Sequence, residues 1–208
     1  MLVLIGLGLA LWRPLELVQL LAWGDAVADR PVVVALIVVA MVVLFAFGLP
    51  GSIGLWLIAP FHPPLLATIL LVGASVVGAL GAYGVARRLG QGWRPQGFSR
   101  RVVDYLETHG NLFTQTALRI LPGFPHSVIN FAGGMLGMGI GGFVTAALVG
   151  LTIKWSVYAS AVHGVVEAVE SGEVIQASTV YPLLALSLLL LAGVWARHRV
   201  VERSGESD

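Results

Sequence analysis

Three long runs without a single charged residue constrain this chain more than any other feature. Residues 31–86, 120–153 and 174–196 contain no Asp, Glu, Lys or Arg, and the longest run has 56 residues. Helices of a soluble fold need a polar face toward water, whereas a membrane-spanning helix needs about 20 mostly apolar residues. The runs therefore predict an all-α polytopic membrane protein and exclude a soluble enzyme, a disordered chain and a coiled coil. Alternating segments of about ten residues, which are typical of a membrane β-barrel, are absent.

Composition and motifs narrow the function classes. The chain has no Cys, which excludes disulfides and thiolate metal sites, and its net charge of +1 argues against nucleic-acid binding. It also lacks the His-Glu-x-x-His, Gly-x-Ser-x-Gly and Walker A patterns of common enzymes. We therefore expect a non-enzymatic protein without a cofactor or a metal. Its expected partners are membrane lipids, and homo-oligomerisation is left open.

The apolar segments predict about four to five spanning helices and two segments that enter the membrane and return. Residues 1–30 are apolar and amphipathic, with too few apolar residues at the start to span alone. No basic residues precede the apolar start of the chain, so we expect residues 1–30 to be retained and not cleaved as a signal peptide. The predicted spans are residues 31–48, 63–86, 141–161 and 179–196. The predicted re-entrant segments are residues 49–62 and 119–138, within a membrane domain over residues 31–165.

The charged residues lie in the connections and predict an orientation. The stretch 87–110 carries five Arg and the tail 197–208 carries three, whereas the acidic loop 162–178 carries no Lys or Arg. The positive-inside rule places the stretch 87–110 and the C-terminus in the cytoplasm and the acidic loop outside. Residues 31–48 would then run from inside to outside, and the two re-entrant segments would enter from opposite sides.

The two re-entrant segments share a motif. Leu49-Pro50-Gly51 opens the first, and Leu121-Pro122-Gly123 opens the second, with Pro125 close behind. Broken apolar segments at matching places in two halves of opposite orientation indicate a transporter site near the bilayer midplane. The alternative is chance, since the tripeptide is common in a chain with many glycines.

Two cations are embedded in apolar sequence. Arg119 directly precedes the second break, and Lys154 lies well inside the span 141–161. Such residues cost about 2.5–3.5 kcal/mol each on the insertion scale, so they pair, snorkel or bind something. Arg matches phosphate with two parallel hydrogen bonds, which predicts an anion contact for Arg119. For Lys154, attraction of an anionic substrate and snorkelling beside Trp155 and Tyr158 are equally good interpretations.

His126 and Asn130 are further candidates for substrate binding. They are four residues apart and share one face of a helix. They could contact a head group or relay a proton, or they could satisfy backbone groups freed by the prolines. Gly133, Gly137 and Gly141 repeat every four residues, a spacing that predicts close helix packing.

The stretch from Arg119 to Gly134 resembles the signature of the VTT-domain proteins, the DedA superfamily, also called SNARE-associated Golgi proteins. The shared pattern is Arg, Pro, Pro, Asn-aromatic and Gly, carried here by Arg119, Pro122, Pro125, Asn130-Phe131 and Gly133. Weaker matches are Pro50-Gly51, Gly78, Gly81, Tyr83, Arg87-Arg88, Phe143, Gly150 and Trp155, so that the resemblance covers about residues 30–165. It implies two inverted re-entrant hairpins in a bacterial inner-membrane protein. It also implies translocation of phospholipids or polyprenyl-phosphate carriers, coupled to protons in some members.

The chain departs from the DedA pattern in two places. The first break has no acidic residue between positions 45 and 60, and the second has Pro125-His126 where DedA proteins carry another Arg. Proton coupling is therefore not expected from the resemblance. We predict a lipid translocator of the flippase or scramblase kind, with Arg119, His126, Asn130 and Lys154 along the path. The alternatives are a small-ion or solute transporter and a non-transporting membrane-integrity scaffold.

Overall fold

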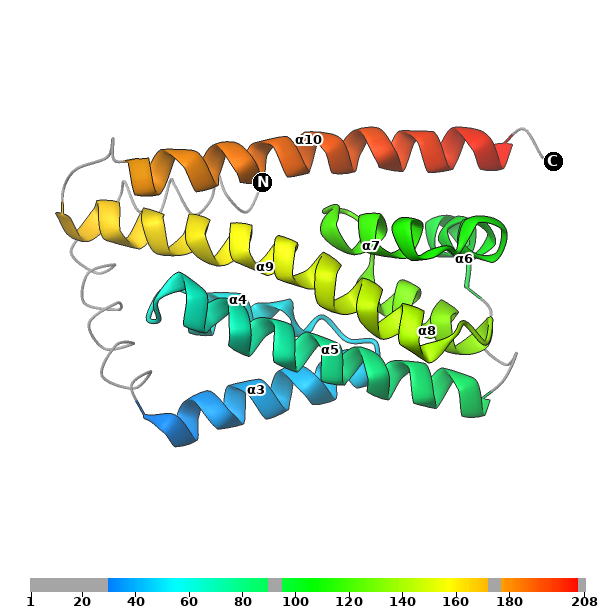
Figure 1. Ribbon diagram of the computed structural model, residues 1–208, viewed down its shortest axis with the longest axis horizontal. Coiled ribbons are helices and arrows are strands. Elements are labelled where there is room, and N and C mark those ends of the chain that lie inside the picture. The colour runs from blue at the N-terminus through cyan, green and yellow to red at the C-terminus, as the bar shows by residue number, and fades with distance from the viewer. Residues whose placement is uncertain (1–29, 90–94, 172–176, 206–208) are drawn as a thin grey trace.

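The computed structural model describes residues 30–89, 95–171 and 177–205, so most of the N-terminal segment 1–30 lies outside the described residues (Figure 1). All secondary structure in these ranges is helical, which confirms the predicted fold class. The elements are α3 (Pro31–Ala46), the 3-10 turn η1 (Gly51–Ile53), α4 (Gly54–Ile58), α5 (Pro64–Leu89), α6 (Gly97–His109), α7 (Leu112–Ile120), α8 (His126–Met135), α9 (Ile140–Ser171) and α10 (Ala177–Gly205).

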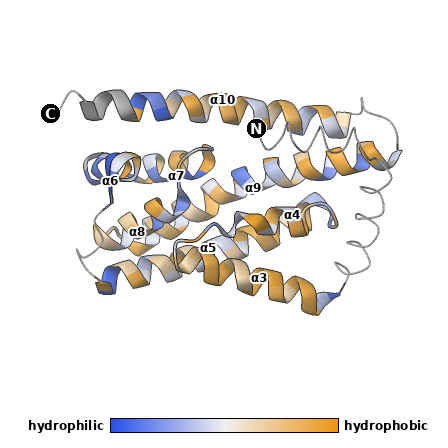
Figure 2. Ribbon diagram, turned by 180° about the vertical axis from the view of Figure 1, so that it is seen from behind, coloured by the Kyte–Doolittle hydropathy of each residue, from blue (hydrophilic) through white to orange (hydrophobic). Residues whose placement is uncertain are grey.

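Three of the described helices are long and apolar enough to cross a membrane, namely α5, α9 and α10. Helices α5 and α9 are antiparallel, because Ser75 contacts Trp155 at one level and the tilted rings of Tyr83 and Phe143 are in contact at another. Apolar residues dominate α3, α5 and much of α10 in Figure 2, whereas polar colour marks α6, the last turn of α5 and some turns in the middle of α9. Arg87 and Arg88 end α5, and α6 and the C-terminal part of α10 lie at the same end of the molecule (Figure 1), here called the arginine end.

Helices α3 and α4 form a hairpin that enters from the end opposite the arginine end (Figure 1). Gly48 closes α3 with φ of 75°, and Leu49 donates its backbone N–H to the Leu44 carbonyl at 2.8 Å. This left-handed glycine cap stops the helix and turns the chain, as glycine does at many helix ends. The chain then returns through η1 and α4 to the start of α5.

The prediction that residues 31–48 form an apolar helix is close to the observed bounds, but the prediction that this helix spans the membrane, and its predicted direction, are wrong. Helix α3 has 16 residues, about 24 Å at 1.5 Å per residue, which is short of a hydrocarbon core of about 30 Å. It runs parallel to α5, because Phe45 lies against Gly78 and Ala46 against Gly81. Hydropathy predicted the burial in lipid, but it could not show that the segment turns back at Gly48.

Helices α7 and α8 form a second hairpin, which enters from the arginine end (Figure 1). Pro122 and Gly123 lie in its turn, where Gly123 has φ of 88°, and Pro125 directly precedes α8 as its N-cap residue. The arms have 9 and 10 residues, so neither can cross a bilayer alone. The two hairpins thus have opposite orientations, as the repeated Leu-Pro-Gly predicted.

The predicted ladder of small residues holds only at Gly133. A Cβ at Gly133 would lie 2.6 Å from the Phe143 ring, so this glycine is a close-packing position. Gly137 instead ends α8 with φ of 63°, and Met138 donates to the Gly133 carbonyl at 3.0 Å in the same cap geometry as Gly48. Gly141 has no neighbour within 4 Å of a Cβ position. The ladder fails because the helix ends between its first and second members.

Small residues of α5 bring both hairpins close to this helix. A Cβ at Gly78 would lie 2.5 Å from the Phe45 Cβ, and Gly134 of α8 contacts the Tyr83 carbonyl and Ala86. Close backbone approach through small residues is the usual basis of helix association in membranes. Helix α5 therefore holds the two hairpins on the same scaffold.

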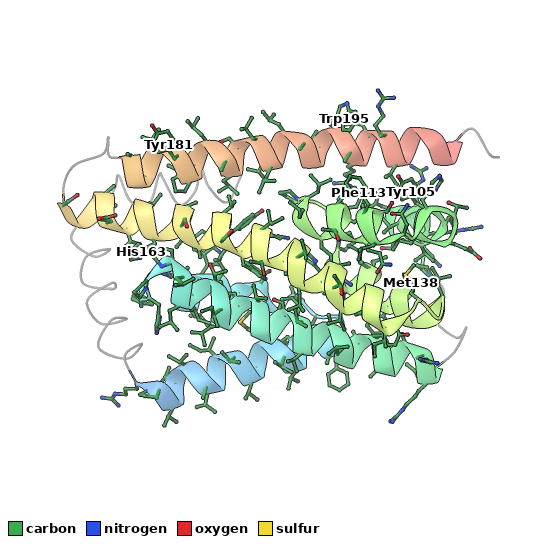
Figure 3. All side chains as sticks on the ribbon, in the orientation of Figure 1. Tyr105, Phe113, Met138, His163, Tyr181 and Trp195 are labelled. Atoms are coloured by element: carbon green, nitrogen blue, oxygen red, sulfur yellow. The ribbon has the colours of Figure 1, made fainter. Side chains whose placement is uncertain are left out.

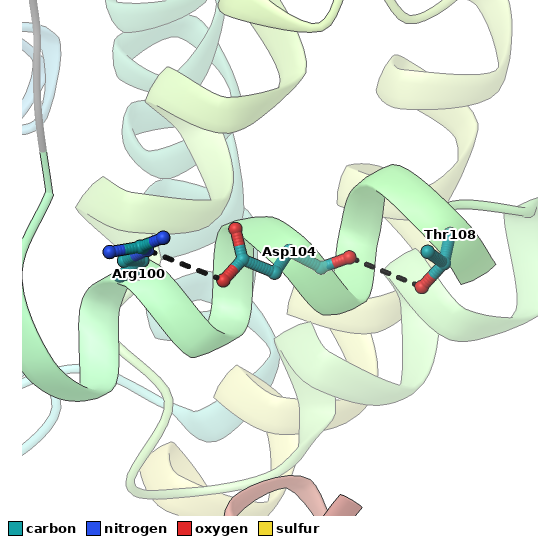
Figure 4. Close-up of polar contacts among 3 residues, drawn as sticks. All are labelled: Arg100, Asp104 and Thr108. Carbon is teal, nitrogen blue, oxygen red and sulfur yellow. Dashed lines mark hydrogen bonds and ion pairs between the residues drawn. The ribbon is translucent and has the colours of Figure 1, made fainter. Parts of the chain in front are cut away.

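Helix α6 has one polar face and one apolar face. On the apolar face, Val102, Val103 and Leu106 are buried in a cluster with residues of α7 and α8. On the exposed face, Arg100 Nε lies 3.7 Å from Asp104 Oδ2, and the Thr108 hydroxyl donates to the Asp104 carbonyl at 3.1 Å (Figure 4). The helix covers the second hairpin with its apolar side.

The acidic loop predicted for residues 162–178 is also shorter than expected. Helix α9 continues to Ser171, so Glu167 belongs to its last turns and residues 172–176 lie outside the described part. Helix α9 extends beyond the predicted span 141–161 because its backbone hydrogen bonds can continue outside the hydrocarbon region, where apolar side chains are not needed.

Candidate functional site

The tips of the two hairpins meet at the middle of α9. A Cβ at Gly48, in the first tip, would lie 3.5 Å from the Ser127 Cβ and 3.1 Å from the Phe131 ring, both in α8. At the second tip, the Arg119 Cβ packs against Gly150, and His126 contacts Lys154. The two irregular backbone turns thus lie beside each other and against α9, although Leu49 in the first turn and Gly123 in the second remain exposed.

Arg119 lies at the centre of this junction and is fully buried. Its Nη1 donates to the Asn130 Oδ1 at 2.8 Å, and its guanidinium lies 4.6 Å from the centre of the Phe143 ring. Its Nε and Nη2 have no hydrogen-bond partner and are shielded from solvent. A buried guanidinium with two unpaired N–H groups is costly, since each unmade hydrogen bond of a charged group costs more than the usual 1–3 kcal/mol or so.

Lys154 and His126 form a second polar contact beside Arg119. The Lys154 Nζ lies 2.5 Å from the His126 Nε2, and Lys154 also approaches the rings of Trp155 and Tyr158 at 5.8 and 5.6 Å. An ammonium group can only donate, so with Lys154 charged the imidazole accepts at Nε2 and carries its hydrogen on Nδ1. That Nδ1 is shielded and has no partner.

A small cavity lies between these groups. Its volume is about 10 Å³, and its lining residues are Phe45, Ser75, Arg119, His126, Asn130, Leu151 and Trp155. This is close to the lower limit for holding one water molecule. Lys154 does not line the cavity and reaches it only through His126.

The structure thus brings together the four predicted site residues, three of them on the cavity wall. It adds Phe143, which stacks on Arg119, and the pair Ser75 and Trp155, in which the indole Nε1 donates to the serine Oγ at 2.9 Å. The sequence had marked Phe143 and Trp155 only as weaker matches to the family, and Trp155 also as a neighbour of Lys154, whereas Ser75 was missed. Ser75 could have been noticed from the sequence, because it is a polar residue inside the longest charge-free run.

The site carries positive charge without a carboxylate nearby. The sequence has no Asp or Glu between positions 108 and 166, and the four site residues contribute only cations, an imidazole and an amide. The ion pair between Arg100 and Asp104 lies elsewhere, on the exposed face of α6. The unpartnered side-chain groups on the cavity wall are the Arg119 Nε and Nη2, which are N–H donors, and the His126 Nδ1, which is a donor when Lys154 is charged. The arrangement is therefore chemically suited to an anion.

Comparison with known proteins gives one match. The family model of the VTT domain matches residues 31–164, which run from the start of α3 into α9 and include both hairpins and all four site residues. Searches of curated proteins and of solved structures found no match.

Proposed function

This chain belongs to the VTT domain family, and from that premise we propose that it moves a lipid with a phosphate-bearing head group between membrane leaflets. The match and the apolar helices make it a multi-pass membrane protein. The polar junction between its hairpin tips is the proposed passage, and Arg119 is the proposed phosphate contact.

The observation that carries this proposal is the set of unpartnered donors on one cavity wall. Arg119 contributes Nε and Nη2, and His126 contributes Nδ1. Keeping such donors buried and unpaired destabilises the fold, so their retention is explained most simply by a ligand that accepts their hydrogen bonds. A phosphate offers several acceptor oxygens and negative charge, which match a guanidinium in particular.

The described conformation is closed to such a ligand. A volume of about 10 Å³ cannot hold a phosphate group, and the contact of Gly48 with Ser127 and Phe131 closes the junction. Translocation therefore requires the two hairpin tips to separate. Because each tip belongs to a short hairpin packed on α5, one hairpin can shift while the long helices remain in place.

The orientation follows the distribution of arginine. Helices α5, α6 and α10 place their Arg residues at the arginine end, which we assign to the cytoplasmic side of a bacterial inner membrane. The first hairpin then enters from outside and the second from the cytoplasm.

A second candidate is favoured by the size of the cavity. A site for one water molecule also suits a small ion or solute, and the contact between Lys154 and His126 would then lie on its path. Under this candidate, substitutions of Lys154 and His126 change ion flux while lipid movement is absent.

The test is a fluorescent-lipid assay on purified protein in vesicles, in which dithionite bleaches only lipid that reaches the outer leaflet. Wild type should expose inner-leaflet phospholipid. Arg119→Gln should slow this exposure by about tenfold or more, and Arg119→Lys should slow it less, because Lys keeps the charge without the paired donors. Arg88→Gln, at the exposed end of α5, is the matched control. If Arg119→Gln scrambles lipid as fast as wild type, Arg119 is not the phosphate contact. If wild type moves neither lipid nor ions, the protein is not a transporter and a scaffold role is favoured.

A further inference from the structure

A larger hollow lies outside the polar junction, between α7 and α10 at the arginine end. Its volume is about 460 Å³, within the range of small-molecule sites and far above that of the central cavity. We call it the α7–α10 groove. Its lining residues are Tyr105, Phe113, Thr114, Ala117, Leu118, Leu121, Phe124, Trp195, Ala196, Arg199 and Val200. Figure 3 labels Tyr105, Phe113 and Trp195 among the side chains at this end.

The groove combines an apolar wall with one cation. Aliphatic and aromatic side chains of α7 and α10 form most of the wall, and Arg199 lies on the α10 side with its guanidinium 5.2 Å from the Trp195 ring. Arg199 is exposed, and within the described residues no carboxylate pairs with it. Asp104 of α6 lies beside Arg100 instead (Figure 4).

The groove also borders the second break. Leu121 and Phe124, which flank Pro122 and Gly123, form part of its wall, and Leu118 directly precedes Arg119. Helix α10 also lies close to this break, because a Cβ at Gly193 of α10 would lie 3.1 Å from the Pro122 Cδ. An occupant of the groove would therefore lie against the turn that presents Arg119.

These observations select one occupant, and we propose that the α7–α10 groove binds an anionic phospholipid. An acyl chain would lie along the apolar wall and the phosphate on Arg199, with Trp195 and Tyr105 at the depth of the head groups, where such rings are enriched. A basic side chain at an anionic membrane surface provides the charge complementarity. The binding of this lipid in the groove does not depend on the proposed function. Only the further step, in which the bound lipid enters the junction, rests on it.

The experiment reports local lipid contacts in vesicles and does not depend on transport. The chain has no cysteine, so Phe113→Cys, an 81% exposed position on the groove rim, accepts a single bimane fluorophore. Brominated phosphatidylglycerol and brominated phosphatidylcholine are compared as quenchers at equal, low mole fractions. The control position is Leu89→Cys, which is 66% exposed and follows Arg87 and Arg88, so it senses the general attraction of anionic lipid to basic residues.

The proposal predicts that phosphatidylglycerol quenches the Phe113 probe about fivefold more effectively than phosphatidylcholine, as expected of one basic side chain at an anionic surface. Arg199→Gln should remove this preference and Arg199→Lys should largely retain it, while the Leu89 probe responds to neither substitution. Equal quenching by both lipids at Phe113, or a preference insensitive to Arg199→Gln, would overturn the proposal. Arg119→Gln should leave the quenching unchanged, so a failure of lipid translocation and a failure of this lipid site give different results.

Discussion

Locking the two hairpin tips together perturbs the proposed passage most directly. The ideal Cβ at Gly48 lies 3.5 Å from the Ser127 Cβ, inside the range of about 3.5–4.5 Å that a disulfide requires. Because the chain has no cysteine, the double variant Gly48→Cys/Ser127→Cys can form only one intramolecular disulfide. We expect this disulfide to form in the closed conformation described here.

The size of the effect on stability follows from two opposing contributions. Gly48 has φ of 75°, so a Cys there costs about 1–2 kcal/mol in backbone strain, and the Phe131 ring must shift slightly. The disulfide joins positions 48 and 127, a loop of about 80 residues, which stabilises by about 4–5 kcal/mol in the chain-entropy account. The oxidised double variant should therefore be more resistant to unfolding than wild type, and the reduced form less.

The functional assay is lipid scrambling in vesicles with and without reductant. If the tips must separate, the oxidised double variant is inactive and reduction restores its rate, whereas each single-cysteine variant has the same rate in both conditions. Full activity in the oxidised protein, with cross-linking verified by loss of thiol labelling, would refute the opening of this junction as the route.

Three further outcomes are expected. Asn130→Leu should lower the free energy of unfolding, measured in mixed micelles, by about 1.5–3 kcal/mol, because it removes the hydrogen bond to a charged Arg119. In a protein that already carries Arg119→Met, the same substitution should lower the free energy of unfolding much less. If the effects of the two substitutions simply add, the pairing is contradicted. Gly78→Val should loosen α3 from α5 and lower the unfolding midpoint, because the added side chain overlaps α3; an unchanged midpoint would contradict that packing. Single cysteines at Ser52 and Ser127 should react with impermeant thiol reagents from opposite sides of the membrane, and labelling from one side only would contradict the inverted hairpins.

The membrane class, the two breaks and the two buried cations could be predicted because charge at membrane depth is expensive. Arg119 and Lys154 stand out in a sequence that otherwise keeps its charges outside the apolar runs. Leu-Pro-Gly at both breaks likewise marks backbone that cannot continue as helix. Both Arg119 and Asn130 were singled out as candidate site residues, but their hydrogen bond to each other, within one hairpin and 11 residues apart, was not predicted.

Other features depend on distant contacts that no local pattern contains. The end of α3 is decided by Gly48, whose left-handed conformation is stabilised by a backbone hydrogen bond from Leu49 to Leu44, and a hydropathy window does not detect it. Gly137 fits a packing ladder by spacing but serves as a helix cap. The contact of Ser75 with Trp155 joins residues 80 positions apart, so it became visible only when α5 and α9 were placed together.

If Arg119 binds the phosphate of a lipid, leaflet exchange should depend on the lipid head group. Rates of leaflet exchange are measured in the same vesicles for a fluorescent phospholipid and for a fluorescent lipid with a neutral sugar head group, using wild type and Arg119→Gln. We expect wild type to move the phospholipid faster and Arg119→Gln to slow only the phospholipid, by about tenfold or more, because a charge-assisted hydrogen bond is lost. Equal rates for the two lipids, equally sensitive or equally insensitive to Arg119→Gln, would contradict this expectation.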